Sequence, residues 1–127
     1  DHFFSYSNTG FRAFTKAWSF NTSITTLEFM GGNGSGGWKL LMDCLMINTS
    51  IQSIDLHWEN ITSDDWACFA KMLSVNESLT NITSICLRHV TAGDALVIAE
   101  GLVTNYTLAR MRGIGSDPPE IGLVQLY

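Results

Sequence analysis

The sequence predicts an α/β repeat solenoid, with a parallel β-sheet on its concave side and α-helices on its convex side. The first observation is a recurring phrase: an Asn, a spacer, a Ser or Thr, and an aliphatic residue. The second is that an amphipathic helical pattern precedes each phrase and a short aliphatic strand pattern follows it. A fixed period of this kind is typical of stacked repeat units. The phrase begins at steps of 27, 28 and 29 residues, at Asn21, Asn48, Asn76 and Asn105.

Composition limits the class of protein and its partners. The chain has 127 residues, of which 46% are hydrophobic, so we expect one packed domain. Its net charge of -5 argues against nucleic acid or an anionic membrane as a partner. Apolar runs are too short to span a bilayer, and the start lacks a signal-peptide pattern. Because the first residue is not Met, we expect a piece of a longer protein.

The first unit is expected to begin after residues 1–9, which we interpret as the end of a preceding element. A helix is predicted over 10–20 and a strand over 24–29. Asn21 should end this helix in the left-handed conformation that Asn tolerates. The Gly-rich segment 30–37 should be a return loop, since it lacks the spacing of phosphate-binding glycine motifs.

The following units repeat this pattern, with Ser63 as the expected N-cap of the third helix. The second helix is expected over 38–47, the third from about Asp64 or Asp65, and the fourth over 93–103. The second strand is expected over 51–56, and its return loop over 57–61. Three apolar columns should then run across the helices and form one continuous core. The columns are Phe11, Trp38, Trp66 and Ala95; Phe14, Leu41, Phe69 and Ile98; and Trp18, Leu45, Leu73 and Leu102.

The third strand, within residues 79–87, has two possible registers, because the segment holds three residues too many for the simple pattern. In one register Leu79 and Ile82 face the core, which leaves Ser84 at a buried position. The other is preferred because it keeps three aliphatic residues inward and only shortens the return loop. A slip of one residue would turn every side chain to the other face. The preferred inward residues are Ile82, Ile85 and Leu87.

The last unit is incomplete. Residues 108–113 are expected to form a fourth strand, and Ser116, followed by Asp117 and two prolines, is typical of a helix start. The chain stops before this fifth helix is complete, and neither end carries the polar cap that a repeat array needs. We therefore expect an interior segment, or one whose ends are capped by neighbouring subunits.

These residues resemble a known family. The phrase N-x-S-[IL]-x-x-[IL]-x-[LF], the asparagine turn at Asn60-Ile61-Thr62, and the helix ending Ile98-Ala-Glu-Gly-Leu102 are similar to leucine-rich repeats of the ribonuclease-inhibitor-like type. The resemblance covers residues 10–127, about four and a half repeats. Such repeats occur in nucleotide-binding immune receptors and in Ran GTPase-activating proteins. The resemblance therefore implies the fold and leaves the function open.

The outward face of the predicted sheet is the candidate binding surface. Its charge changes from acidic in the early repeats to basic in the late ones. This fits a protein-docking face with a matching charge gradient, and it fits equally a solvated face that avoids like charges. The expected columns are Glu28, Asp55, Cys86 and Arg112; Met30, His57 and Arg88; and Thr26, Ser53, Ser84 and Arg110. Trp58 is the candidate exposed aromatic anchor. The candidate partner-binding residues are Glu28, Asp55, His57, Trp58, Arg88, Arg110 and Arg112.

No catalytic or metal site is predicted. Asp55, His57 and Cys86 contain the residue types of a nucleophilic triad, but a regular strand ladder lacks the strained turn or helix start that such nucleophiles use. His57, Cys86 and His89 lack the spacing of metal ligands. We therefore expect a non-enzymatic protein-interaction module without a cofactor or a small-molecule ligand.

The cysteines and the sequons point to different compartments. Three cysteines without close spacing favour a reducing, cytoplasmic location. The N-x-S/T sequons leave a secreted or cell-surface glycosylated ectodomain as an alternative. A GTPase-activator-like domain is a further alternative, by the family resemblance alone, with Arg88 as its arginine. The seven sequons, four of which are the repeat phrase itself, are at Asn21, Asn33, Asn48, Asn60, Asn76, Asn81 and Asn105.

Overall fold

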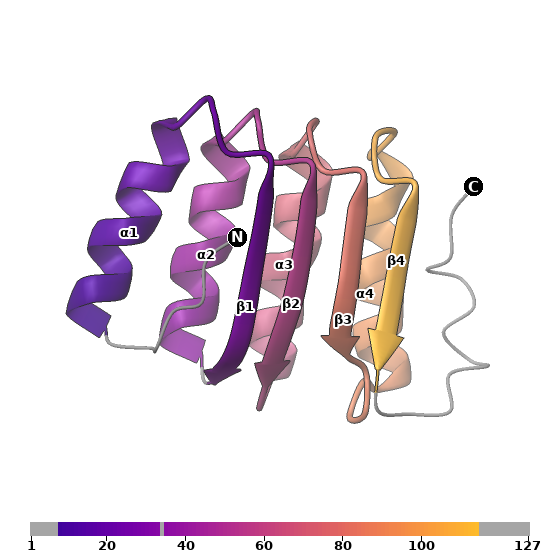
Figure 1. The fold of residues 1–127 in the computed structure, drawn as a ribbon. Helices are drawn as coiled ribbons and strands as arrows, with labels where there is room; N and C mark the ends of the chain where they lie inside the picture. Colours follow the sequence, from indigo (N-terminus) through magenta and orange to yellow (C-terminus); the bar gives the residue numbers. More distant parts are fainter. Residues whose placement is uncertain (1–7, 34, 115–127) are drawn as a thin grey trace.

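The computed structural model describes residues 8–33 and 35–114, in which four helices alternate with four strands (Figure 1). The expectations for the first seven residues and for a fifth helix from Ser116 lie outside the described residues. The elements are α1 Asn8–Phe20, β1 Thr26–Asn33, α2 Ser35–Ile47, β2 Ser53–Glu59, α3 Ser63–Val75, β3 Asn81–Cys86, α4 Ala92–Val103 and β4 Arg110–Ile114.

The strands form one parallel sheet in the order β1-β2-β3-β4. Parallel neighbours need a crossover between them, and each crossover here is one helix. The four helices lie together on one side of the sheet (Figure 1). We name the other side the open sheet face. The predicted α/β class, with a parallel sheet and one helix per strand, is confirmed.

The core lies between the sheet and the helices and is rich in aromatic rings. Ring centroids in this cluster are 5.5 to 6.3 Å apart, mostly in edge contacts, and the Trp38 indole N–H donates to the Asp65 carbonyl at 2.8 Å. The predicted inward columns hold at most helix positions. The inward placement predicted for Phe14 is wrong, because its side chain is 43% exposed and packs beside Trp18. Thr15 and Ser19 are buried on the same helix. Cluster members are Phe11, Trp18, Phe29, Trp38, Trp58, Trp66 and Phe69.

The repeated Asn ties each unit both to itself and to the unit before it. The Asn48 Oδ1 accepts from the backbone N–H groups of Ser50 and Ile51, each at 2.7 Å. Its Nδ2 donates to the carbonyls of Trp18 at 2.7 Å and Asn21 at 3.0 Å. One buried amide therefore closes its own turn and satisfies two carbonyls of the preceding unit.

The same bonds recur in the next two units. Asn76 Nδ2 donates to the Leu45 carbonyl at 2.8 Å, and Asn105 Nδ2 donates to the Leu73 carbonyl at 2.8 Å. The left-handed backbone expected at Asn21 is wrong, since the only non-glycine residues with positive φ in the described ranges are Asn60 and Ser84. The amide side chain makes the turn, so the backbone stays in an ordinary conformation.

The third strand contains a bulge, which corrects its predicted register. Ile54 pairs with Ile82 and Asp55 with Thr83, so the register that set Cys86 beside Asp55 is wrong. The pairing of β3 with β4 shifts between Ile82 and Ile85, where Ser84 has φ 62°. The bulge absorbs the surplus residues, and all four aliphatic residues are buried: Leu79, Ile82, Ile85 and Leu87.

Several element boundaries differ from the predictions. The Gly-rich segment is not a long loop, because β1 continues to Asn33 and α2 begins at Ser35. Similarly, β2 runs through Glu59 into the expected return loop. The α3 N-cap is Thr62, one residue before the expected Ser63. Its hydroxyl accepts from the Asp65 N–H at 3.2 Å, and the Asp65 carboxylate accepts from the Thr62 N–H at 2.9 Å.

Replacing Asn48 by Ala should lower the free energy of unfolding by about 3 kcal/mol, because buried N–H and carbonyl groups lose their partners. Urea unfolding followed by circular dichroism measures this. Thr49→Ala, at the exposed spacer of the same phrase, is the matched control and should change stability by less than about 0.5 kcal/mol. Equal stability of the two variants would contradict the structural role of this amide.

Gly101 marks a close approach of α4 to α3, since a Cβ added there would lie 2.5 Å from the Ala70 carbonyl oxygen. Gly101→Ala should therefore destabilise by about 2 kcal/mol or more, because backbone must move. Gly93→Ala, in the same helix, meets only Thr91 Oγ1 at 3.8 Å and should be neutral or stabilising. Thermal unfolding of both variants checks this, and a neutral Gly101→Ala would refute it.

Candidate partner-binding face of the sheet

Alternation along β2 separates core residues from surface residues. Ile54, Leu56 and Trp58 are buried, and Asp55 and His57 between them are partly exposed. Trp58 is only 2% exposed, so its prediction as a surface anchor is wrong. The reason is that β2 continues past the expected end of the strand, which places position 58 on the inward side.

One polar column crosses the open sheet face from β1 to β3. Glu28 pairs in register with Asp55, and Asp55 with Thr83. The Thr83 hydroxyl donates to Asp55 Oδ1 at 3.1 Å, and the His57 Nε2 lies 3.5 Å from the same oxygen. The Thr83 hydroxyl thus orients the Asp55 carboxylate, and the His57 ring lies beside it. Thr83 takes the position predicted for Cys86, while Glu28 and Asp55 stand side by side as expected.

A second column runs through Ser53 and Asn81 to Arg110, which are register partners on β2, β3 and β4. Asn81 Nδ2 donates to the Ser53 hydroxyl at 3.2 Å, and its buried Oδ1 has no hydrogen-bond partner among the described residues. Asn81 takes the position predicted for Ser84. Arg112 follows on β4, between Met111 and Gly113, and both arginines are exposed.

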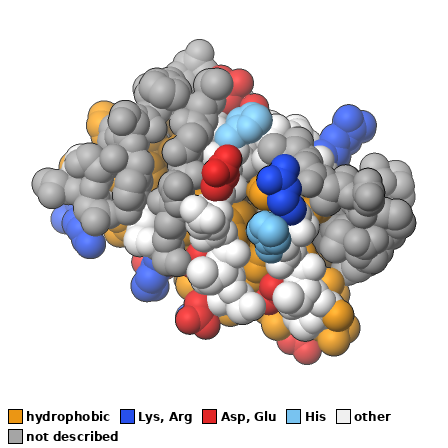
Figure 2. All heavy atoms as spheres, turned by 90° about the horizontal axis from the view of Figure 1, so that it is seen from below, with side chains coloured by type: hydrophobic (Ala, Val, Ile, Leu, Met, Phe, Trp, Pro, Cys, Tyr) orange, Lys and Arg blue, Asp and Glu red, His pale blue; other side chains and the backbone are white. Residues whose placement is uncertain are grey.

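The predicted change from acidic to basic side chains across the sheet is also present in the observed register. Acidic side chains stand on β1 and β2, at Glu28 and Asp55, and β4 carries Arg110 and Arg112. Arg88 is exposed in the turn directly after β3, next to His89. Figure 2, which looks at the end toward which the strands point, shows His side chains near acidic and basic ones. The structure therefore brings the predicted charged residues to one face and its edge, with Trp58 excluded.

The suggested triad is not assembled. Asp55 and His57 are neighbours, but Cys86 pairs with Ile114 and Asp55 pairs with Thr83. Among the described residues no three His, Cys, Asp or Glu side chains are grouped to hold a metal ion. No helix in the described ranges is long and apolar enough to cross a membrane.

Three sequon asparagines are used structurally. A glycan attaches to the side-chain amide nitrogen of Asn. In Asn48, Asn76 and Asn105 this nitrogen donates to a backbone carbonyl of another unit. The side chains of Asn48 and Asn76 are also buried, since these residues are only 3% and 4% exposed. In this fold these three sequons therefore serve the turn and the packing of neighbouring units.

Residues that sequence reasoning missed on this face are Thr83 and Asn81. The predicted register of β3 put Cys86 and Ser84 at the positions that Thr83 and Asn81 occupy. The available signal was the surplus length of segment 79–87, which a bulge accommodates without losing any inward aliphatic residue.

The fold defines an α/β protein with a parallel sheet in sequential strand order. No family model matches the chain, and no curated protein matches it either. A solved structure described as "Leiomodin-1 Actin-Binding Site 2 (ABS2)" is similar, with a TM-score of 0.72 and 22% sequence identity. The match covers 94% of this chain and 70% of that chain. At this identity the similarity concerns the fold.

The three cysteines are unpaired and differ in their surroundings. Cys44 is buried, whereas Cys68 and Cys86 are half-buried. Burial raises the pKa of the Cys44 thiol to about 11, against a smaller opposing effect of its hydrogen bond with Ser19. At neutral pH this thiol is therefore neutral and a poor nucleophile.

Because the pKa of Cys44 is higher in the folded state, the unfolded thiol ionises first as the pH rises. Its contribution to stability should be complete below about pH 9 and should be lost as the pH rises toward about 11. Urea unfolding across this range measures the loss, and Cys44→Ala should remove the part of the pH dependence that comes from this thiol.

At pH 8 a thiol reagent should modify Cys44 about tenfold more slowly than Cys68. Equal rates would contradict the burial.

Proposed function

We propose that the chain is a non-enzymatic protein-interaction module that docks a protein partner on its open sheet face. We also propose that the chain is a leucine-rich-repeat solenoid of the ribonuclease-inhibitor-like type, in which this face is concave. The observation that carries the function is the ordered polar column in which Asp55 accepts a hydrogen bond from Thr83, lies beside His57 and pairs in register with Glu28. A ladder of backbone hydrogen bonds fixes the positions of these residues.

Such a surface suits protein recognition for two reasons. The strand backbone and the bonded pairs Asp55–Thr83 and Ser53–Asn81 are fixed before binding, so this surface loses less conformational entropy on binding than a loop would. The opposite charges at the two edges of the sheet also orient the partner and suppress wrong alignments. The matching surface would be basic toward β1 and β2 and acidic toward β4.

Actin is the first partner to test, because the similar solved structure is described as an actin-binding site. The similarity itself concerns only the fold, so a neighbouring subunit of a larger complex is the second candidate. We place the protein in the cytoplasm, a proposal supported by the three unpaired cysteines and by the structural use of three sequon asparagines.

Reversing the charges of the sheet face should weaken partner binding. We expect Asp55→Lys combined with Arg112→Glu to raise the Kd for monomeric actin at least about tenfold, measured by isothermal titration calorimetry. The control, Lys71→Glu combined with Glu100→Lys on the exposed helices, makes the same two kinds of change and should alter the Kd less than about twofold.

The outcomes distinguish a wrong partner from a wrong binding face. If the unaltered protein does not bind actin, the actin proposal fails, and the same variants are then compared on a subunit that copurifies with the native protein. If the helix control weakens binding as much as the sheet variant does, the proposed face is wrong. Circular dichroism and thermal unfolding confirm that both double variants remain folded.

A further inference from the structure

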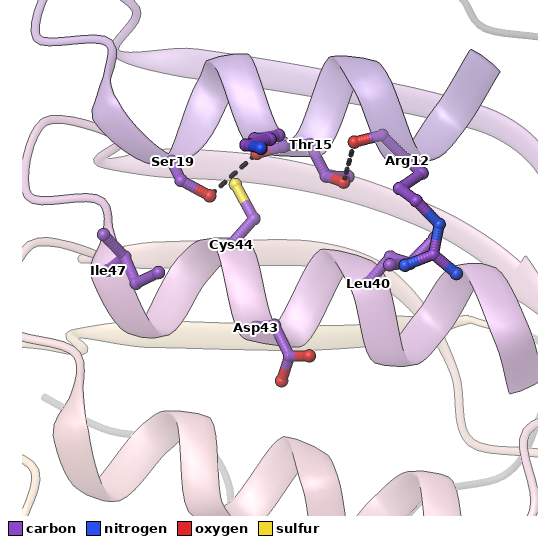
Figure 3. A pocket seen from close by; sticks show the side chains of 8 residues that line it. Arg12, Thr15, Ser19, Leu40, Asp43, Cys44 and Ile47 are labelled. Carbon is purple, nitrogen blue, oxygen red and sulfur yellow. Dashed lines mark hydrogen bonds between the residues drawn. The ribbon is translucent and has the colours of Figure 1, made fainter. Parts of the chain in front are cut away.

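We propose a second binding surface, on the helical side of the molecule: the groove between α1 and α2 binds an acidic peptide segment of a protein partner. Two adjoining hollows of about 290 and 410 Å³ lie there and share Arg12, Leu40 and Asp43. Figure 3 shows the first of them, with side chains of both helices along it. This surface is separate from the open sheet face and from any partner bound there.

The groove exists because the side chains between α1 and α2 are small. Thr15 and Ser19 of α1 face Cys44 of α2, and all three line the first hollow. At the next repeat, the positions that correspond to Thr15 and Cys44 carry larger side chains, the buried Met42 of α2 and Met72 of α3.

Between α3 and α4 the helices close the space differently. There Ala70 and Gly101 let the two backbones touch. Of the three helix pairs described, α1 and α2 therefore combine small facing side chains with space left between them.

The floor of the groove is neutral. Thr15 Oγ1 donates to the Phe11 carbonyl at 3.0 Å, and Ser19 Oγ donates to the Thr15 carbonyl at 2.8 Å. Both hydroxyls thus have partners within their own helix, and burial keeps the Cys44 thiol protonated. Ile47, 49% exposed, adds an apolar wall. A small or aliphatic side chain of a ligand can rest on such a floor without leaving a buried charge unpaired.

The rim of the groove is basic, although the whole chain has a net charge of -5. Three of the seven Lys and Arg residues line it: Arg12, Lys16 and Lys39. Asp43 is the acidic residue of the lining; it lies 3.6 Å from Lys39 and points away from α1 in Figure 3. No ion pair joins the side chains of Arg12 and Lys16 to any described residue. The rim therefore offers two cations to carboxylates.

The dimensions favour an extended peptide. The lining reaches from Gly36 to Ile47 along α2, which corresponds to about 16 Å of helix. An extended chain covers that length with about five residues. The hollows are open to solvent along this path, so they suit a segment lying across the surface. A ligand with aliphatic side chains on one face and carboxylates on the other fits both floor and rim.

Fluorescence anisotropy of a labelled octapeptide of alternating Glu and Leu tests the proposal on the intact chain. The acidic peptide should bind, and the same peptide with Lys in place of Glu should not. Lys16→Glu should raise the Kd at least about fivefold. The control is Lys71→Glu, because Lys71 is exposed on α3 at the position that Lys16 holds on α1, and it should change the Kd less than about twofold.

A second variant separates the groove from charge alone. Ser19→Met introduces the residue that α2 carries at the corresponding position, Met46, and fills the groove without changing the net charge. It should weaken binding as clearly as Lys16→Glu does while thermal unfolding shows a folded protein. The proposal is overturned if the acidic peptide does not bind, if Lys16→Glu and Lys71→Glu act equally, or if Ser19→Met has no effect. Preferential binding of phosphatidylserine vesicles or single-stranded DNA would also overturn it.

Discussion

The side-chain amide of the repeated Asn is the interaction on which the rest of the structure depends. In Asn48 one oxygen closes the turn from helix to strand, and the nitrogen of the same amide bonds to two carbonyls of the preceding unit. Local folding and the packing of neighbouring units are thereby coupled in one group. The strand that follows therefore starts at a fixed position relative to the preceding strand. This sets the register of the sheet and aligns the polar columns on its open face.

Period and hydrophobic pattern were sufficient to predict the alternating elements, the parallel sheet and most of the core, because each depends on local spacing. The errors have non-local causes. Ser84 takes a left-handed conformation within a bulge, and the bulge lets all four aliphatic residues around it be buried. Phe14 follows the inward pattern of later helices, but Thr15 and Ser19 occupy the side of α1 that packs on α2. Position 58 is inward because β2 runs longer than its aliphatic pattern indicates.

The candidate site was predictable to the extent that it depends on alternation along single strands. Glu28 and Asp55 were placed side by side correctly, because β1 and β2 share a regular register at that point. Thr83 and Asn81 were missed because their places depend on a bulge within β3 itself, which local alternation does not predict. The basic groove was not predictable at all, since it requires knowing which helix pair is left incompletely filled. Acidic composition also concealed it, because a net charge says nothing of where charges gather.

The central claim, that the repeated amides join neighbouring units, is tested most directly by hydrogen exchange of side-chain amide protons, observed by NMR. The Nδ2 protons of Asn48, Asn76 and Asn105 should exchange slowly and become labile only when the units separate. Those of the exposed Gln52 should exchange at the rate of a free amide. Exchange of the three asparagine amides as fast as that of Gln52 would contradict the account.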